Sequence, residues 1–192
     1  MLFTQRLELI DGTVELLRAT LPYCPPVSED AAGWDRQAAR RIADEISTLG
    51  ELLHARIPMS WPTDLLDQKA IEWTIRHLED AKLRGTAGTY YVVLREGATR
   101  TLVGMCGFHT PKEGTVQVGY GIVSEYYRRG IASEATRAMI AELRKRPGVQ
   151  RLTALTYPDH VASLGVMTKC GMTYVGPGAE PGTVEYELAR VN

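Results

Sequence analysis

The stretch that decides the fold runs over residues 118–135 and reads VGYGIVSEYYRRGIASEA. Its first residues have the alternating, β-branched character of a strand, and apolar residues at helical spacing follow from Ile131. The chain therefore passes from a strand through a short turn directly into a helix. Free amide groups at a helix start, together with the helix dipole, form a binding site for an anion.

The residues of this turn suit a phosphate. Gly130 lets the backbone approach a phosphate without a Cβ in the way, and Ala132 is small for the same reason. Arg128 and Arg129 add positive charge beside the site. We interpret the loop from Tyr127 to Ala132 as a pyrophosphate site. The alternative for the two arginines is a solvated charge pair on the surface.

Other phosphate motifs fit this sequence less well. There is no GxxxxGK[ST] stretch, which argues against a P-loop. Gly119 and Gly121 could begin a dinucleotide fingerprint, but Ser124 stands where the third glycine is required.

Outward from this loop, the second half of the chain alternates strands and helices. Three strands joined by short turns, with Gly97 in the first turn and residues 111–114 in the second, predict an antiparallel meander. The expected strands are 89–94, 101–108, 115–123, 151–157, 172–175 and 183–188, and the expected helices are 131–145 and 161–169.

The first half of the chain is predicted to be mainly helical. A strand over 5–10 is followed by a helix capped by Asp11 that ends near Thr20. A second helix is expected over Asp35–His54, and a third from a cap at Thr63 or Asp64 to about Arg84, with an apolar stripe of Leu65, Ile71, Ile75 and Leu78. Trp61 and Trp73 are interpreted as core residues.

Size and composition set limits on the function. A chain of 192 residues with 44% hydrophobic and 23% charged residues suits one globular domain. A net charge of −1 gives no reason to expect nucleic acid as a partner. The N-terminus has no signal-peptide core and the longest strongly apolar stretch, Tyr90–Leu94, is too short for a membrane, so we expect a cytoplasmic protein. Cys24, Cys106 and Cys170 form no metal motif.

Five segments, in order along the chain, resemble one known family. They are Thr4–Leu9 (TQRLEL), Gly104–Phe108 (GMCGF), residues 118–120 (VGY), residues 127–135 (YRRGIASEA), and His160–Ser163 (HVAS) with Lys169–Met172 (KCGM). Together they resemble the GNAT superfamily of acetyltransferases, most closely the branch that acetylates ribosomal-protein N-termini. The resemblance extends from Thr4 to Leu188.

The resemblance implies an α/β (α+β) GNAT fold in a single domain over residues 1–192. Its central sheet is mixed, mostly antiparallel and of about seven strands, splits into a V and is flanked by helices. Residues 20–85 would form the acceptor side and 115–172 the acetyl-CoA-binding core. A β-bulge near Ile122 and Val123 would open the V. The implied cofactor-binding residues are Ile122, Val123, Arg128, Arg129, Gly130, Ile131, Ala132, Ser133, His160, Ser163 and Lys169; for Ser163, a polar residue at a helix start is an equal alternative.

This chain departs from the family pattern in the positions that handle protons. Relatives often carry Glu where Gln117 stands, and the tyrosine that many members use as a general acid falls at Met167. His160 replaces the usual Asn, and Tyr127 the first Gln or Arg of the loop motif. His109, His160, Glu185 or a water relay could replace the base.

A site without a strong base favours a weakly basic amine. Neutralising a lysine with a pKa of about 10.4 at pH 7 costs about 4.6 kcal/mol, against roughly 1 kcal/mol for an α-amine. We therefore expect direct acetylation of a primary amine, on a protein N-terminus or a small molecule, with acetyl-CoA as the donor.

Two other functions stay open at this point. The first is a catalytically weak or inactive acyl-CoA-binding or partner-binding module on the same fold. The second is an aminoglycoside-modifying enzyme whose acidic cleft would be lined by Asp64, Asp67, Glu72, Glu79 and Asp80, although a solvated helix face explains these residues equally well. The sequence is compatible with a monomer and with a homodimer.

Overall fold

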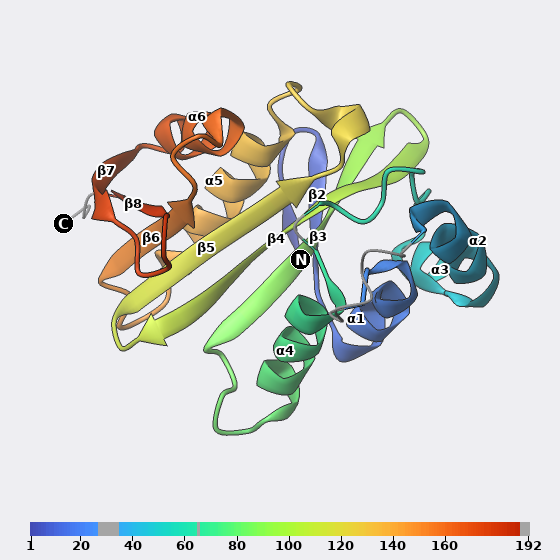
Figure 1. The fold of residues 1–192 in the computed structure, drawn as a ribbon, viewed down its shortest axis with the longest axis horizontal. Coiled ribbons are helices and arrows are strands. Elements are labelled where there is room, and N and C mark those ends of the chain that lie inside the picture. Colours follow the sequence, from blue (N-terminus) through green and yellow to red (C-terminus); the bar gives the residue numbers. More distant parts are fainter. Residues whose placement is uncertain (27–34, 65, 189–192) are drawn as a thin grey trace.

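A computed structural model describes residues 1–26, 35–64 and 66–188. Its central feature is a mixed sheet in the order β1-β2-β3-β4-β5-β6-β8-β7, in which only β5 and β6 are parallel (Figure 1). The strands are β1 Leu2–Phe3, β2 Leu7–Asp11, β3 Ala87–Glu96, β4 Thr99–Lys112, β5 Thr115–Ile122, β6 Arg151–Thr156, β7 Met172–Pro177 and β8 Val184–Leu188.

The expected mixed, mostly antiparallel sheet is confirmed. The described chain has eight strands rather than about seven because Leu2–Phe3, too short to give a sequence signal, pairs with β2. Leu65, part of the apolar stripe expected from the sequence, lies outside the described residues.

The predicted V is present at the junction of β5 and β6. Their backbone pairing is confined to residues 115–117 of β5 and 151–153 of β6, after which the two strands continue without pairing to each other. The expected β-bulge at Ile122 and Val123 is wrong, because β4 and β5 keep one register from His109↔Gln117 to Gly104↔Ile122. The V opens instead because β6 leaves a regular β5.

The meander strands are close together at the open end of the V. A Cβ added to Gly104 of β4 would lie 2.2 Å from the Gly121 carbonyl oxygen of β5, so only glycine allows this approach. β4 also has one extra residue relative to β3. This irregularity lies nearby, between the pairs Val92↔Gly104 and Val93↔Leu102.

The helical first half differs from the expected boundaries at its caps. Thr13, not Asp11, caps α1 (Val14–Thr20), because Asp11 is still part of β2. Asp67, rather than Thr63 or Asp64, caps α4 (Gln68–Glu79), which ends before Arg84.

The helix expected over Asp35–His54 is two helices, α2 (Arg36–Ile46) and α3 (Leu49–Leu53). Asp35 caps α2 as expected. The break occurs at Ser47, whose hydroxyl donates to the Ala19 carbonyl at 2.7 Å and accepts from the Leu49 amide at 3.1 Å. A serine that satisfies backbone groups outside a helix favours ending it.

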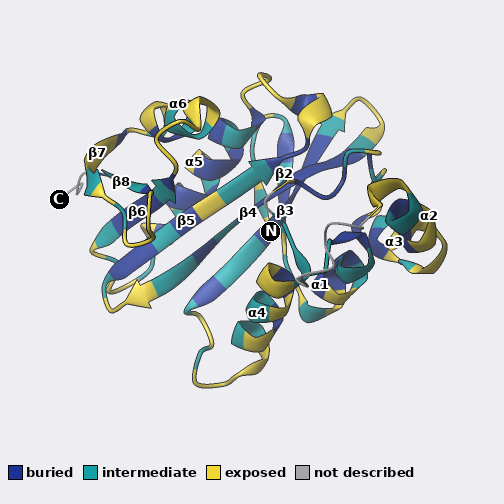
Figure 2. Ribbon diagram, viewed as in Figure 1, coloured by how far each residue is buried: buried dark blue, intermediate teal, exposed yellow. Residues whose placement is uncertain are grey.

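Helices cover both faces of the sheet. Neighbouring β5 residues point to opposite faces. Tyr120 bonds Ser163 of α6 (Val161–Lys169), whereas the Cβ direction of Gly121 meets Thr63, in the segment before α4. On the α6 side, α5 (Ile131–Leu143) packs on β2, β4 and β5. Figure 2 shows buried residues concentrated in the central strands, and exposed residues on parts of the helices and loops around them. Trp61 is 0% exposed, as predicted for a core residue.

Candidate active-site cleft

A cleft of about 660 Å³ lies where β5 and β6 separate. It is lined from both faces of the sheet. The sequence-predicted residues Gln117, His109, His160 and Ser163 all lie on its wall. Further lining residues include Trp73 of α4, Tyr120 of β5, Met167 of α6 and Glu180 of the loop before β8. The fold thus brings together residues that are far apart in sequence.

The loop after β5 exposes the amides of a helix start. The first backbone bond of α5 runs from the Glu134 amide to the Gly130 carbonyl at 3.0 Å. The amides from Arg128 to Ser133 have no backbone partner among the described residues. Arg128 and Gly130 both have positive φ, of 60° and 75°, which turns successive amides toward a common side. This cradle fits a pyrophosphate.

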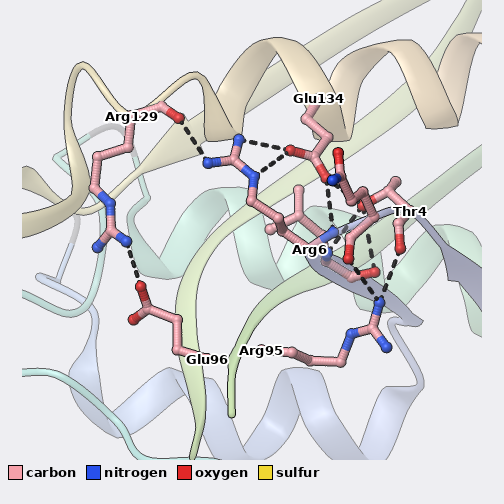
Figure 3. Close-up of polar contacts among 8 residues, drawn as sticks. Thr4, Arg6, Arg95, Glu96, Arg129 and Glu134 are labelled. Atoms are coloured by element: carbon pink, nitrogen blue, oxygen red, sulfur yellow. Dashed lines mark hydrogen bonds and ion pairs between the residues drawn. The ribbon is translucent and has the colours of Figure 1, made fainter.

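The two arginines of the loop are held differently. The Arg129 guanidinium donates to Glu96 and lies 5.1 Å from the centre of the Tyr126 ring, so its charge is already paired (Figure 3). Arg128 is exposed and forms no ion pair with the described residues. Of the two predicted phosphate ligands, Arg128 has the available charge.

The remaining predicted cofactor residues contribute mainly backbone. Ile131 and Ser133 are buried, and their amides have no backbone partner among the described residues, so a ligand would contact their backbone rather than their side chains. The Val123 amide donates to the Val103 carbonyl at 2.9 Å, and its carbonyl accepts from Tyr126 at 3.0 Å. Because backbone groups alternate along a strand, those of Ile122 point to the open side of the V. Ile122 is therefore the better placed of the two for pairing with a ligand.

Lys169 lies apart from these groups. It ends α6, its carbonyl accepts from Arg137 at 3.1 Å, and it does not line the cleft. A cofactor role for Lys169 stays a prediction.

His109 and Gln117 form a cross-strand pair on β4 and β5. The Trp73 ring lies edge-on to His109, with 5.7 Å between ring centres. Burial lowers the pKa of His109; Glu180 opposes this shift and His77 adds to it. His109 is therefore mostly neutral at pH 7 and able to accept a proton. Trp73, interpreted from sequence as core, is a half-buried wall of the cleft.

Tyr120 is a site residue that the sequence argument passed over. Its hydroxyl lies 3.0 Å from both the carbonyl and the Oγ of Ser163. Burial raises the pKa of Tyr120 to about 12, against the smaller opposing effect of the Ser163 bond. Its place on β5, on the face opposite Gln117, was the signal that could have identified it.

The other base candidates occupy different environments. His160 precedes α6 and lines the cleft, with Nδ1 3.4 Å from the Thr156 hydroxyl. Glu185 lies 3.8 Å from Arg151 and does not line the cleft, so it is no longer a base candidate.

Four of the five acidic residues considered for an aminoglycoside site have other roles. Asp67 caps α4, Asp64 and Glu79 pair with Arg36 and Arg18, and Asp80 accepts from the Lys82 amide. None of the five, including Glu72, lines the cleft.

The described residues contain no helix long and apolar enough to span a bilayer. Within the same ranges, no cluster of His, Cys, Asp or Glu could hold a metal ion.

Solved structures share this fold over nearly the whole chain. A putative ribosomal-protein-serine acetyltransferase from Vibrio cholerae has a TM-score of 0.58 and 20% identity, and covers 98% of this chain and 97% of its own. The ribosomal L7/L12 α-N-protein acetyltransferase RimL, in complex with coenzyme A, has a TM-score of 0.57 and 15% identity. This match covers 96% of the present chain and 94% of RimL.

Sequence comparison supports the same assignment. YoaA, an uncharacterized N-acetyltransferase of Bacillus subtilis (strain 168), is 31% identical over 80 residues, which are 41% of this chain and 45% of YoaA. The chain spans about half the length of the curated relatives it matches. The model of the acetyltransferase (GNAT) domain family matches residues 29–173, well over half of the 192 residues, and the chain therefore belongs to that family.

Proposed function

We propose that this chain transfers the acetyl group of acetyl-CoA to a primary amine. The observation that carries the proposal is the continuity of two features. β5 runs from the closed end of the V at Gln117 to its open end at Ile122, and the loop with free amides follows directly. An extended thioester could pair with β5 while its pyrophosphate binds the loop.

Named residues fit the parts of this donor. The backbone of Ile122 would pair with the amides of the pantetheine arm. The amides from Arg128 to Ser133 and the exposed guanidinium of Arg128 would bind the pyrophosphate. RimL shares the fold, and its solved structure contains coenzyme A, which supports the assignment by analogy.

The reaction needs a neutral amine at the thioester carbonyl. The nitrogen forms a bond to the acetyl carbon, the carbon–sulfur bond breaks, and the sulfur leaves as a thiolate that takes up a proton. The amine loses its proton to a base, for which the neutral, half-buried His109 is the candidate in the cleft wall. Gln117, its cross-strand neighbour, cannot take a proton but can orient the amine by hydrogen bonding.

The cleft chemistry also restricts the acceptor. Glu180 is the one Asp, Glu, Lys or Arg among its described lining residues. A carboxylate next to the acceptor amine would find no cationic partner there, whereas an incoming ammonium group would be attracted to Glu180. With no strong base, a peptide α-amine is favoured over both a lysine side chain and a free amino acid.

Comparison of three acceptors tests this proposal. Initial rates are measured with acetyl-CoA and a peptide free only at its α-amine, a matched peptide free only at lysine, and the N-terminal amino acid alone. The proposal expects the first to be fastest. Acetylation of the lysine peptide without the α-amine peptide would refute the acceptor assignment.

A second function is an acyl-CoA-binding module without turnover. It is favoured by Gln117 and by Met167, which is buried in the cleft where many relatives place a tyrosine acid. Binding of acetyl-CoA without transfer to any amine would select this function.

A further inference from the structure

A cluster of donors surrounds Glu134, the acidic residue in the first turn of α5 (Figure 3). One carboxylate oxygen accepts from the Thr4 hydroxyl and, at 3.1 Å, from the Arg6 amide. The other accepts from Nε and Nη2 of Arg6 at 2.8 and 2.6 Å. Thr4 and Arg6 come from the turn between β1 and β2, about 130 residues away along the chain.

This carboxylate is a potential competitor for a phosphate. Free amides and the dipole at a helix start attract any nearby negative charge, and Glu134 is the acidic side chain of that turn. Burial raises the pKa of Glu134, but the bonds from Thr4 and Arg6 outweigh it and leave the pKa below its usual value. Glu134 is therefore charged, and Arg6 both neutralises it and holds it toward the β1–β2 turn.

Arg6 also fixes the orientation of one peptide group in the loop. Its Nη1 donates to the Arg129 carbonyl at 3.1 Å. A trans peptide is planar and its C=O and N–H point in opposite directions, so the Gly130 amide points away from Arg6. The same guanidinium thus holds the acidic side chain back and turns an amide outward.

We propose that Arg6 is a positioning residue for the phosphate-binding loop, keeping the Glu134 carboxylate and the Arg129 carbonyl off the side on which the pyrophosphate binds. This inference rests on the proposed acetyl-CoA site. It assigns the β1–β2 turn a part in cofactor affinity although that turn does not line the cleft.

Opposite effects of two substitutions distinguish this role from plain structural support. Arg6→Met and Glu134→Gln break the same ion pair. If the pair only stabilised the fold, both would weaken CoA binding to a similar extent. We expect Arg6→Met to raise the Kd for CoA about tenfold, within the range for a charge in the first turn of a helix. Glu134→Gln removes the competitor, so we expect its Kd to be no higher than that of the wild type.

The experiment measures the Kd of CoA by calorimetry, and the binding of S-acetylpantetheine, which lacks phosphates, by NMR titration. Arg6→Met should leave S-acetylpantetheine binding unchanged, and Arg6→Met/Glu134→Gln should recover most of the lost CoA affinity. Arg18→Met is the matched control, because Arg18 forms a 2.8 Å pair with Glu79 away from the loop. If Arg6→Met does not fold, Glu134→Gln alone decides.

Equal weakening by Arg6→Met and Glu134→Gln, or an unchanged Kd in Arg6→Met, would overturn the inference. So would weakened CoA binding by Glu134→Gln on its own. A wild-type protein that does not bind CoA would instead refute the proposed function, so the two failures are distinguishable.

Discussion

His109 and Gln117 lie directly opposite each other on β4 and β5, and Gln117 is also the last β5 residue paired with β6. The candidate base and its neutral neighbour therefore lie at the closed end of the V. Directly opposed residues on adjacent antiparallel strands keep their side chains on one face of the sheet. The rigid meander, rather than a loop, sets their separation.

The pH dependence of transfer tests His109. A base works in its neutral form, and because the pKa of His109 is lowered, kcat/KM should rise with pH below the ordinary histidine range and be level at pH 7. His109→Gln should lower kcat/KM about 100-fold and remove this acid limb. Rates measured from about pH 5 to pH 9 would show it. An identical profile in the variant would exclude His109 as the base.

Glu180 provides a second pH test. Its negative charge raises the pKa of His109 against the effect of burial. Glu180→Gln should therefore lower that pKa further and move the acid limb to lower pH. An acid limb that stays in place would mean that Glu180 does not influence the pKa of His109. A limb that moves to higher pH would contradict the electrostatic argument.

Gly130 tests the phosphate cradle by thermal unfolding. Acetyl-CoA at 100 times its Kd should add about 2.7 kcal/mol, or about 5–10 °C in Tm for a chain of this size. Gly130→Glu should abolish that shift, because any side chain strains the loop at this positive φ and a carboxylate adds negative charge beside the phosphate site. Gly97→Glu is the control, since Gly97 also has positive φ but lies in the β3–β4 turn. A shift kept in Gly130→Glu, or lost in Gly97→Glu, would contradict the assignment.

Neighbouring arginines should differ in their effect on CoA binding. Arg128→Ala removes a charge that has no ion-pair partner among the described residues, whereas Arg129→Ala removes one that is paired with Glu96. We expect Arg128→Ala to raise the Kd for CoA about threefold to tenfold at low salt, and Arg129→Ala less. The difference should shrink at high salt because exposed charges are screened. A larger effect of Arg129→Ala would reverse the assignment.

Tyr120→Phe tests the bond between β5 and α6. Loss of the hydroxyl leaves the Ser163 groups with one partner fewer and should lower the free energy of unfolding by about 1 kcal/mol. Amide exchange at the start of α6 should quicken while the strands of the meander keep their protection. Unchanged stability and exchange would mean that this bond does not hold α6.

Local patterns predicted the central part of the fold. The strand, turn and helix of residues 118–135 and the three-strand meander were readable because each depends on neighbouring residues. Helix caps were less certain, because Asp11 and Thr13 are both good caps and β2 pairing decided between them. The break at Ser47 depends on a bond to Ala19 of α1, which no helical periodicity reveals.

Contacts between distant segments could not be predicted. The resemblance to the GNAT superfamily placed Thr4, Arg6 and Glu134 in two of the family's motifs, but it did not indicate that hydrogen bonds join these residues, which lie about 130 positions apart. The edge contact between Trp73 and His109 depends on how α4 packs on the sheet. The expected bulge was wrong because the geometry of the V comes from the path of β6, not from an irregularity in β5.

The short pairing of β5 with β6 has a mechanical consequence. Strands β1 to β5 and strands β6 to β8 are two parts of one sheet, and three residue pairs between β5 and β6 join them. Apart from the two-residue edge strand β1, no neighbouring strands of the described sheet share fewer residue pairs than β5 and β6. The Tyr120–Ser163 hydrogen bond joins β5 to α6, beyond the region where β5 and β6 pair. We therefore expect a change in the width of the V to leave the strand pairing within each of these two parts intact.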